Sequence, residues 1–175
     1  MLSLLAASAV ALDIAVPALR QALDSSADWR MERELSGARR TLVSTGIVEC
    51  VSGKGIKWTV LHPFPSSVEM TPEKMIFADE DGTSEKSLDE MPHYAEIRAR
   101  TDSFAAGDEK AFDGLFELDA SLASDGKGWT LRMTPEVRAM RRLFTSIELT
   151  GDEALTNVVM QTGDGGISRI RFNRR

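Results

Sequence analysis

The side chains that most often carry catalysis or bind metals are scarce in this sequence. The chain has one cysteine, Cys50, and two histidines, His62 and His93. One cysteine excludes an internal disulfide and a zinc site built from several cysteines. Cys50 shares its parity with Val48 along a predicted strand, which indicates a buried, inert thiol. His62 stands before Pro63 at a predicted strand end, and His93 stands at a predicted helix start, so both are interpreted as structural or exposed residues.

The sequence also lacks the short motifs of common enzymes. It has no G-x-S-x-G nucleophile elbow, no phosphate-binding P-loop and no dinucleotide-binding G-x-G-x-x-G. The acidic stretches at 79–82 and 152–153 do not have the alternating spacing of a calcium loop, which favours solvated turns. We therefore expect no catalytic residue, no metal site and no cofactor.

Length and composition favour a single folded domain. The chain has 175 residues, of which 42% are hydrophobic, and its formal net charge is −6. One domain of this size can bury a substantial core. A net negative charge disfavours nucleic acid as a partner, because such binding needs a clustered basic surface.

Residues 1–11, MLSLLAASAVA, form the longest apolar run. The run ends in Ala-Val-Ala and is shorter than the about 20 residues that span a bilayer, so it has the pattern of a secretory signal peptide. No Lys or Arg precedes Arg20, and the alternative is a buried helix that continues through Leu19 and Leu23. Residues 12–175 are expected to form one domain, and a signal peptide implies export.

Alternation of apolar and polar residues predicts a series of short strands. Trp29 and Met31 share one parity while Arg30 and Glu32 take the other, which is typical of a half-buried strand. Glycine-rich turns such as 52–55 favour hairpins between neighbouring strands. We expect about ten strands in all, at 29–35, 45–51, 56–60, 68–70, 75–78, 116–122, 129–133, 147–149, 158–160 and 167–172.

Helical spacing interrupts the strand pattern in the middle of the chain. The apolar residues between 87 and 116 predict two amphipathic helices, the second of them over 111–116. With the early helix, this gives an α+β fold that is mainly antiparallel β. The expected architecture is one strongly curved, unclosed sheet whose concave face is covered by the helices.

Methionine marks the apolar face of the predicted sheet. The chain has eight methionines, the initiator included, and three tryptophans, and strand alternation sends most of them to that face. Methionine is unbranched and polarisable, so it suits a surface that must fit a flexible chain. Core packing against the helices is the competing interpretation.

The order of several short motifs resembles the LolA family of periplasmic lipoprotein carriers. The resemblance covers about Leu19 to Phe172. It rests on Trp29-x-x-Glu32-Arg33-x-Leu35, Leu42-Val43 before Gly46, Gly55-Ile56-x-Trp58, Pro63-Phe64, Trp129-x-Leu131-x-Met133-x-Pro135, Ile147-x-Leu149-x-Gly151-Asp152, and Gly163-Asp164 before Ile170-x-Phe172.

The resemblance implies an unclosed β-barrel with a hydrophobic cavity beneath a helical lid. A carrier of this family works as a monomer in the periplasm, takes the acyl chains of a lipoprotein or another lipid from an inner-membrane exporter, and passes them to an outer-membrane acceptor. The residues expected to line the cavity are Trp29, Met31, Val48, Trp58, Val60, Met70, Met75, Phe77, Met133 and Met160. The residues expected to form the lid are Leu19, Leu23, Met91, Tyr94 and Ile97.

The sequence departs from the family pattern, most clearly at the residue that closes the lid, and two other functions stay open. The family implies an arginine near the end of the second strand that closes the lid, whereas this chain has Val-Ser-Gly-Lys at 51–54; Arg33 or Lys54 are the candidates to replace it.

A non-catalytic envelope lipid-binding or sensing domain of the same fold is the main alternative. An enzyme acting on envelope lipids would need a polar cluster inside the cavity, for which Arg33, Glu49, His62 and Glu69 are the nearest candidates.

Overall fold

The computed structural model describes residues 2–37, 40–51, 53–108, 110–124 and 126–175, without the side chains of residues 2–10 and 93. Eleven strands and three α-helices lie within these ranges. The helices are α1 (Leu2–Ala22), α2 (Pro92–Ala105) and α3 (Arg138–Arg141), and a 3-10 turn, η1, covers Leu88–Glu90. The strands are β1 (Ser26–Glu34), β2 (Thr41–Val51), β3 (Gly55–His62), β4 (Ser66–Met70), β5 (Lys74–Asp79), β6 (Gly82–Ser87), β7 (Phe116–Leu122), β8 (Trp129–Pro135), β9 (Phe144–Gly151), β10 (Leu155–Thr162) and β11 (Ile167–Arg174).

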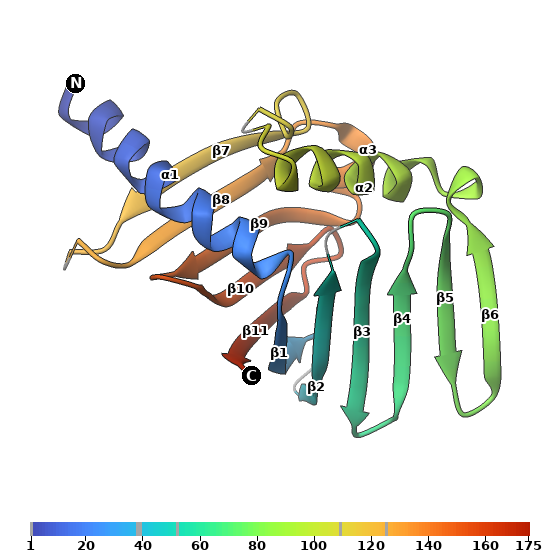
Figure 1. Ribbon diagram of the computed structural model, residues 1–175. Coiled ribbons are helices and arrows are strands. Elements are labelled where there is room, and N and C mark those ends of the chain that lie inside the picture. Colours follow the sequence, from blue (N-terminus) through green and yellow to red (C-terminus); the bar gives the residue numbers. More distant parts are fainter. Residues whose placement is uncertain (1, 38–39, 52, 109, 125) are drawn as a thin grey trace.

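All the strands belong to one antiparallel sheet. Their order is β6-β5-β4-β3-β2-β1-β11-β10-β9-β8-β7, so β1 and β11 meet in the middle and β6 and β7 form the two edges. The sheet curves strongly without closing, and α1 and α2 lie over one face of it (Figure 1). This confirms the predicted fold class, an unclosed and mainly antiparallel β-sheet with helices on its concave face.

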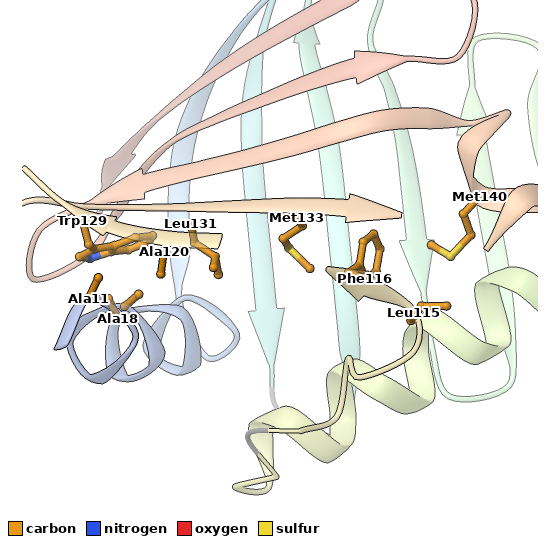
Figure 2. Packing of buried hydrophobic residues seen from close by; sticks show 10 residues of the cluster. Ala11, Ala18, Leu115, Phe116, Ala120, Trp129, Leu131, Met133 and Met140 are labelled. Carbon is orange, nitrogen blue, oxygen red and sulfur yellow. The ribbon is translucent and has the colours of Figure 1, made fainter. Parts of the chain in front are cut away.

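Helix α1 packs tightly on the strands at one end of the sheet. Ala11, Ala15 and Ala18 recur at helical spacing and are 0%, 0% and 4% exposed. They face β7 and β8, and Figure 2 shows Ala11 and Ala18 beside Trp129. We call this group the α1 cluster; it comprises Ala11, Ala15, Ala18, Leu115, Phe116, Ala120, Trp129, Leu131, Met133 and Met140.

A second group of buried residues lies further along the same face of the sheet. We call it the Trp29 cluster; it comprises Ala27, Trp29, Val48, Val158 and Ile170, with Trp58 and Phe172 among the partly buried residues packed against it. Ile147, Leu149 and Leu155 pack against both clusters and connect them. The concave face is therefore apolar from β7 to β3.

Two tryptophans of these clusters each lie on a glycine of the neighbouring strand. Trp29 pairs with Gly46 and Trp129 pairs with Gly151. A Cβ at Gly46 would lie 2.6 Å from the Trp29 ring and 1.8 Å from the Thr59 carbonyl oxygen, and one at Gly151 would lie 2.8 Å from the Trp129 ring. Each glycine thus leaves the room that the indole needs to lie flat against the sheet.

The structure corrects the predicted elements at two places. Strand β6 was not expected, because its sequence, Gly-Thr-Ser-Glu-Lys-Ser, has no apolar alternation; it forms at the sheet edge by pairing with β5. The second helix expected over 111–116 is wrong. Residues 110–115 form turns that lead into β7, because Ala111, Leu115 and Phe116 are buried by packing into the interior rather than by one helix face.

The N-terminal segment is helical from Leu2 onward, and α1 runs through residue 11 without a break. Met1 and the side chains of residues 2–10 lie outside the described part of the structure. Ala11 is fully buried, as expected for a helix that contacts the sheet. Cleavage after residue 11 stays a prediction.

Replacement of Gly46 by alanine tests the contact between Trp29 and β2. We expect Gly46→Ala to lower the free energy of unfolding by about 2 kcal/mol, because the added methyl overlaps the indole and a backbone carbonyl. Urea unfolding followed by tryptophan fluorescence measures the change. Glu49→Ala, at an exposed position of the same strand, serves as the control. Equal unfolding midpoints for the two variants would contradict this account of the packing.

Candidate functional site

An apolar cavity of about 310 Å³ lies between the C-terminal part of α1 and the concave face of the sheet. Its floor comes from β1, β2, β3 and β11, and its roof comes from the last residues of α1 and the segment that follows. The residues that line it are Ala18, Gln21, Ala22, Leu23, Ser25, Ala27, Val48, Cys50, Ile56, Trp58, Ala154, Leu155, Phe172 and Arg174.

Aromatic rings form one wall of this cavity. The rings of Trp58 and Trp29 are stacked with their centroids 4.6 Å apart, and the Phe172 ring meets Trp58 edge-on at 6.2 Å. Trp29 is 2% exposed and lies behind Trp58, so its packing orients the ring that faces the cavity. The wall is thus an apolar surface made of aromatic rings that pack on one another.

Small residues explain why the space is open. Four alanines line the cavity, from α1, from β1 and from the turn before β10: Ala18, Ala22, Ala27 and Ala154. Earlier in α1, Ala11 and Ala15 are fully buried against the sheet. The same short side chains that bring α1 close to β7 and β8 leave space where the helix faces β1 and β2.

Polar groups are gathered at the rim. Gln21, Ser25 and Arg174 are the polar or charged side chains among the described residues that line the cavity, apart from the thiol of Cys50. A more open groove of about 760 Å³ adjoins it, because both are lined by Ala18 and Gln21. Lys127, Asp152 and Glu153 line that groove.

Arginine side chains hold the helices over the sheet. Arg20 of α1 donates from Nε to the Phe104 carbonyl oxygen of α2 at 3.2 Å, and its guanidinium lies 5.4 Å from the centre of the Phe104 ring. Arg98 of α2 is 6% exposed and donates to the Met70 carbonyl oxygen at 3.3 Å and to Asp102 at 2.9 Å. These contacts connect α1 to α2 and α2 to the end of β4.

Arg33 and Lys54, proposed from the sequence to replace the family's lid arginine, are both exposed. The described contacts between the helices come from Arg20 instead. Sequence reasoning did not identify Arg20, because nothing in its surroundings along the chain separates it from an ordinary surface arginine.

All ten residues predicted to line a cavity lie on one face of the sheet. Cross-strand partners share a face, and the register relates them through pairs such as Val48 with Trp58 and Met70 with Met75. The members of this set are Trp29, Met31, Val48, Trp58, Val60, Met70, Met75, Phe77, Met133 and Met160.

These ten residues occupy different surroundings on that face. Val48 and Trp58 line the cavity. Trp29, Met31, Val60 and Met160 belong to or pack against the Trp29 cluster, and Met133 belongs to the α1 cluster. Met75 is 6% exposed, and Met70 and Phe77 are half-buried further along the sheet. Their contact with a bound molecule stays a prediction.

The predicted lid residues also lie in different surroundings. Leu23 lines the cavity, whereas Leu19 and Ile97 pack against the α1 cluster. Met91 is half-buried at the start of α2, and Tyr94 is 39% exposed. The roof of the cavity is therefore formed by the end of α1, and α2 lies beside it.

Several lining residues were not predicted from the sequence. Cys50 and Ile56 each lie two residues from a predicted member of the site in the same strand, and Phe172 pairs with Trp29. All three share the face of the predicted site, so strand parity could have identified them. Ala27 lies two positions before Trp29 and shares its face. Nothing in the sequence indicated that Arg174 lines a cavity, because a charged residue at a strand end is ordinarily solvated.

The polar residues considered for an enzyme do not converge in the cavity. Glu49 and Glu69 both pair with Lys57, on the face of the sheet opposite to Cys50 and Trp58. Neither they nor Arg33 and His62 are among the residues that line the cavity. The structure therefore does not bring these four residues together inside the cavity.

Within the described ranges, no helix has both the length and the apolar character of a membrane span.

Comparison with known proteins identifies a shared fold. No family model matches the sequence, and no curated protein matches it. Among solved structures, an uncharacterized conserved protein from Thermus thermophilus is 11% identical, with 94% of this chain and 87% of that chain covered and a TM-score of 0.51. A LolA superfamily protein from Nitrosomonas europaea is 11% identical, with 95% and 91% covered and a TM-score of 0.47.

A putative outer membrane lipoprotein-sorting protein domain from Vibrio parahaemolyticus is also similar. It is 12% identical, with 95% of this chain and 91% of that chain covered and a TM-score of 0.41. LolA superfamily and lipoprotein-sorting proteins are thus among the structures that this chain is similar to. At these identities the likeness concerns the fold alone.

The pKa of the Cys50 thiol indicates how far water is excluded from this part of the cavity. Burial raises the pKa of Cys50 from 9.0 to about 11, because the apolar surroundings disfavour the thiolate. Between these two values the unfolded chain loses a proton that the folded protein keeps. This linkage lowers the free energy of unfolding as the pH rises from about 9 to 11.

Alkylation of Cys50 measures this pKa directly. The thiolate is the reacting species, so we expect the rate of modification by iodoacetamide to rise with pH toward a midpoint of about 11. Intact-mass spectrometry follows the reaction, and Cys50→Ser confirms the site. A midpoint at the ordinary value of 9.0 would show that water reaches the thiol freely.

Proposed function

We propose that this chain is a periplasmic carrier that binds the acyl chains of a lipoprotein or a related lipid in the cavity beneath α1. The observation that carries the proposal is the cavity itself: about 310 Å³ of space lined mainly by apolar side chains, with polar groups at the rim. Sites for small ligands commonly have volumes of about 300–1,000 Å³ and such a lining.

The energetics of alkyl chains support this use of the space. Each methylene group moved from water into an apolar site contributes about 0.8 kcal/mol. Trp58 and Val48 offer that apolar surface from the sheet, and Leu23 offers it from the segment that follows α1. An acyl chain between them would gain several kcal/mol over its free state in water, which is sufficient for reversible binding.

A carrier must also release its cargo. The roof over the cavity is the last turn of α1 together with Leu23, and Arg20 connects that turn to α2 through Phe104. A small displacement of this one segment would open the cavity while the α1 cluster stays packed. We propose that an inner-membrane exporter loads the cavity and that an outer-membrane acceptor, with a higher affinity for the acyl chain, receives it.

Filling part of the cavity should weaken binding without unfolding the protein. Ala22 ends α1 and lines the cavity, so the larger side chain of Ala22→Phe has free space to occupy. At about 0.8 kcal/mol for each methylene excluded, loss of room for two methylenes weakens binding about tenfold. Displacement of the neutral fluorophore N-phenyl-1-naphthylamine by dodecanoate measures the affinity.

The matched control for this experiment is Ala106→Phe, because Ala106 is exposed at the end of α2. We expect this variant to bind as the natural chain does. Equal affinity of the Ala22→Phe variant, with its fold intact by circular dichroism, would contradict binding in this cavity.

A transfer assay separates a carrier from a binding or sensing domain. A carrier should increase the rate at which a fluorescent acyl lipid moves from donor to acceptor vesicles, in proportion to protein concentration. The Ala22→Phe variant should lose this increase. Tight binding of the lipid with no increase in its transfer would favour the sensing alternative.

A further inference from the structure

Arg174 lies at the rim of the cavity on the concave face. In β11 it lies two residues after Phe172 and on the same face; the Phe172 ring lies against Trp58, and Arg174 pairs with Ala27 of β1. Phe172, Ala27 and Arg174 all line the cavity. Arg174 is exposed overall although it lines the cavity, and an arginine in such a position can place its apolar stem on apolar surface while its guanidinium stays in water.

The positive charge of Arg174 is not matched within the described part of the chain. No hydrogen bond or ion pair is formed between its side chain and another described residue, whereas the adjacent Arg175 forms an ion pair with Asp28 at 2.8 Å. Among the described residues that line the cavity, Arg174 is the one that carries a charge at neutral pH. Asp28, which follows the cross-strand partner Ala27 in β1, is thus already paired.

The other polar groups at this rim are uncharged. Gln21 is exposed, and Ser25 donates its hydroxyl to the Ala22 carbonyl oxygen at 3.0 Å, which leaves the Ser25 oxygen available as an acceptor only. The acids of the neighbouring groove, Asp152 and Glu153, line the adjoining hollow rather than the cavity. Among the described residues that line the cavity, the charge is therefore positive, and the other lining residues are uncharged and mainly apolar.

We propose that the cavity takes a single-chain amphiphile whose anionic head, a carboxylate or a phosphate, binds the Arg174 guanidinium. This rests on the proposed function, because it assumes that an alkyl chain occupies the cavity. A volume of about 310 Å³ is at the low end for ligand sites, which fits one chain rather than several. Guanidinium forms strong, charge-assisted hydrogen bonds to both kinds of head.

The test compares three probes that share a twelve-carbon chain: dodecanoate, dodecyl phosphate and dodecanol. Each displaces N-phenyl-1-naphthylamine from the full chain at pH 8. We expect the two anions to bind about tenfold more tightly than the alcohol, as a charge-assisted hydrogen bond would give. The anion that binds more tightly identifies which head group the site prefers.

Arg174→Gln should remove this preference. We expect its affinity for the anions to fall about tenfold while its affinity for dodecanol is unchanged. Arg174→Lys should retain part of the preference, because it keeps the charge and loses the fork of donors. Arg171→Gln is the matched control, since Arg171 lies on the same strand and faces the opposite side of the sheet.

The outcomes separate this inference from the proposed function. Equal binding of the acid and the alcohol by the natural chain would overturn the role of Arg174 and leave an acyl site in place. Binding of none of the three probes would overturn both. Arg174 could also stabilise the C-terminal end of α1, where a cation is favourable; a fall in thermal stability of Arg174→Gln with no change in anion preference would support that role and contradict ours.

Discussion

The contact between α1 and the sheet decides where the interior is filled and where it is hollow. An open sheet with an apolar face must keep that face from water, and here a single long helix and α2 cover it (Figure 1). Ala11 and Ala15 bring α1 into full contact with β7 and β8. Toward its end the helix faces Ala27 and Trp58, and its own side chains are too short to fill the space.

The packed and hollow parts of the interior depend on each other. The α1 cluster fixes the helix on the sheet (Figure 2), so the last turn of α1 can cover a cavity without the support of residues inside it. Trp29 is held flat on Gly46 and stacks on Trp58, which keeps the opposite wall in place. Apolar side chains that line an empty space lose packing contacts, which costs free energy, and here this loss is confined to one site. A bound alkyl chain would restore those contacts.

Much of the fold could be predicted from the sequence, because alternation reports directly which residues share a face. All ten predicted cavity residues do lie on the concave face, and the strands around Trp29, Trp58 and Trp129 form as expected. Strand β6 escaped prediction because an edge strand can be polar on both faces. The location of the cavity and the role of Arg20 depend on the path of α1 over the sheet, which residues distant in sequence determine together. For this reason the methionine content indicated an apolar face but not which part of it is filled.

Contacts between a bound chain and the cavity wall test the account most directly. Nuclear Overhauser effects between ¹³C-labelled dodecanoate and the protein would locate the methylenes. The account predicts effects to the Trp58 indole and to the methyl groups of Val48 and Leu23, which all line the cavity. Effects confined to exposed apolar residues such as Phe64, which is 77% exposed, would contradict it.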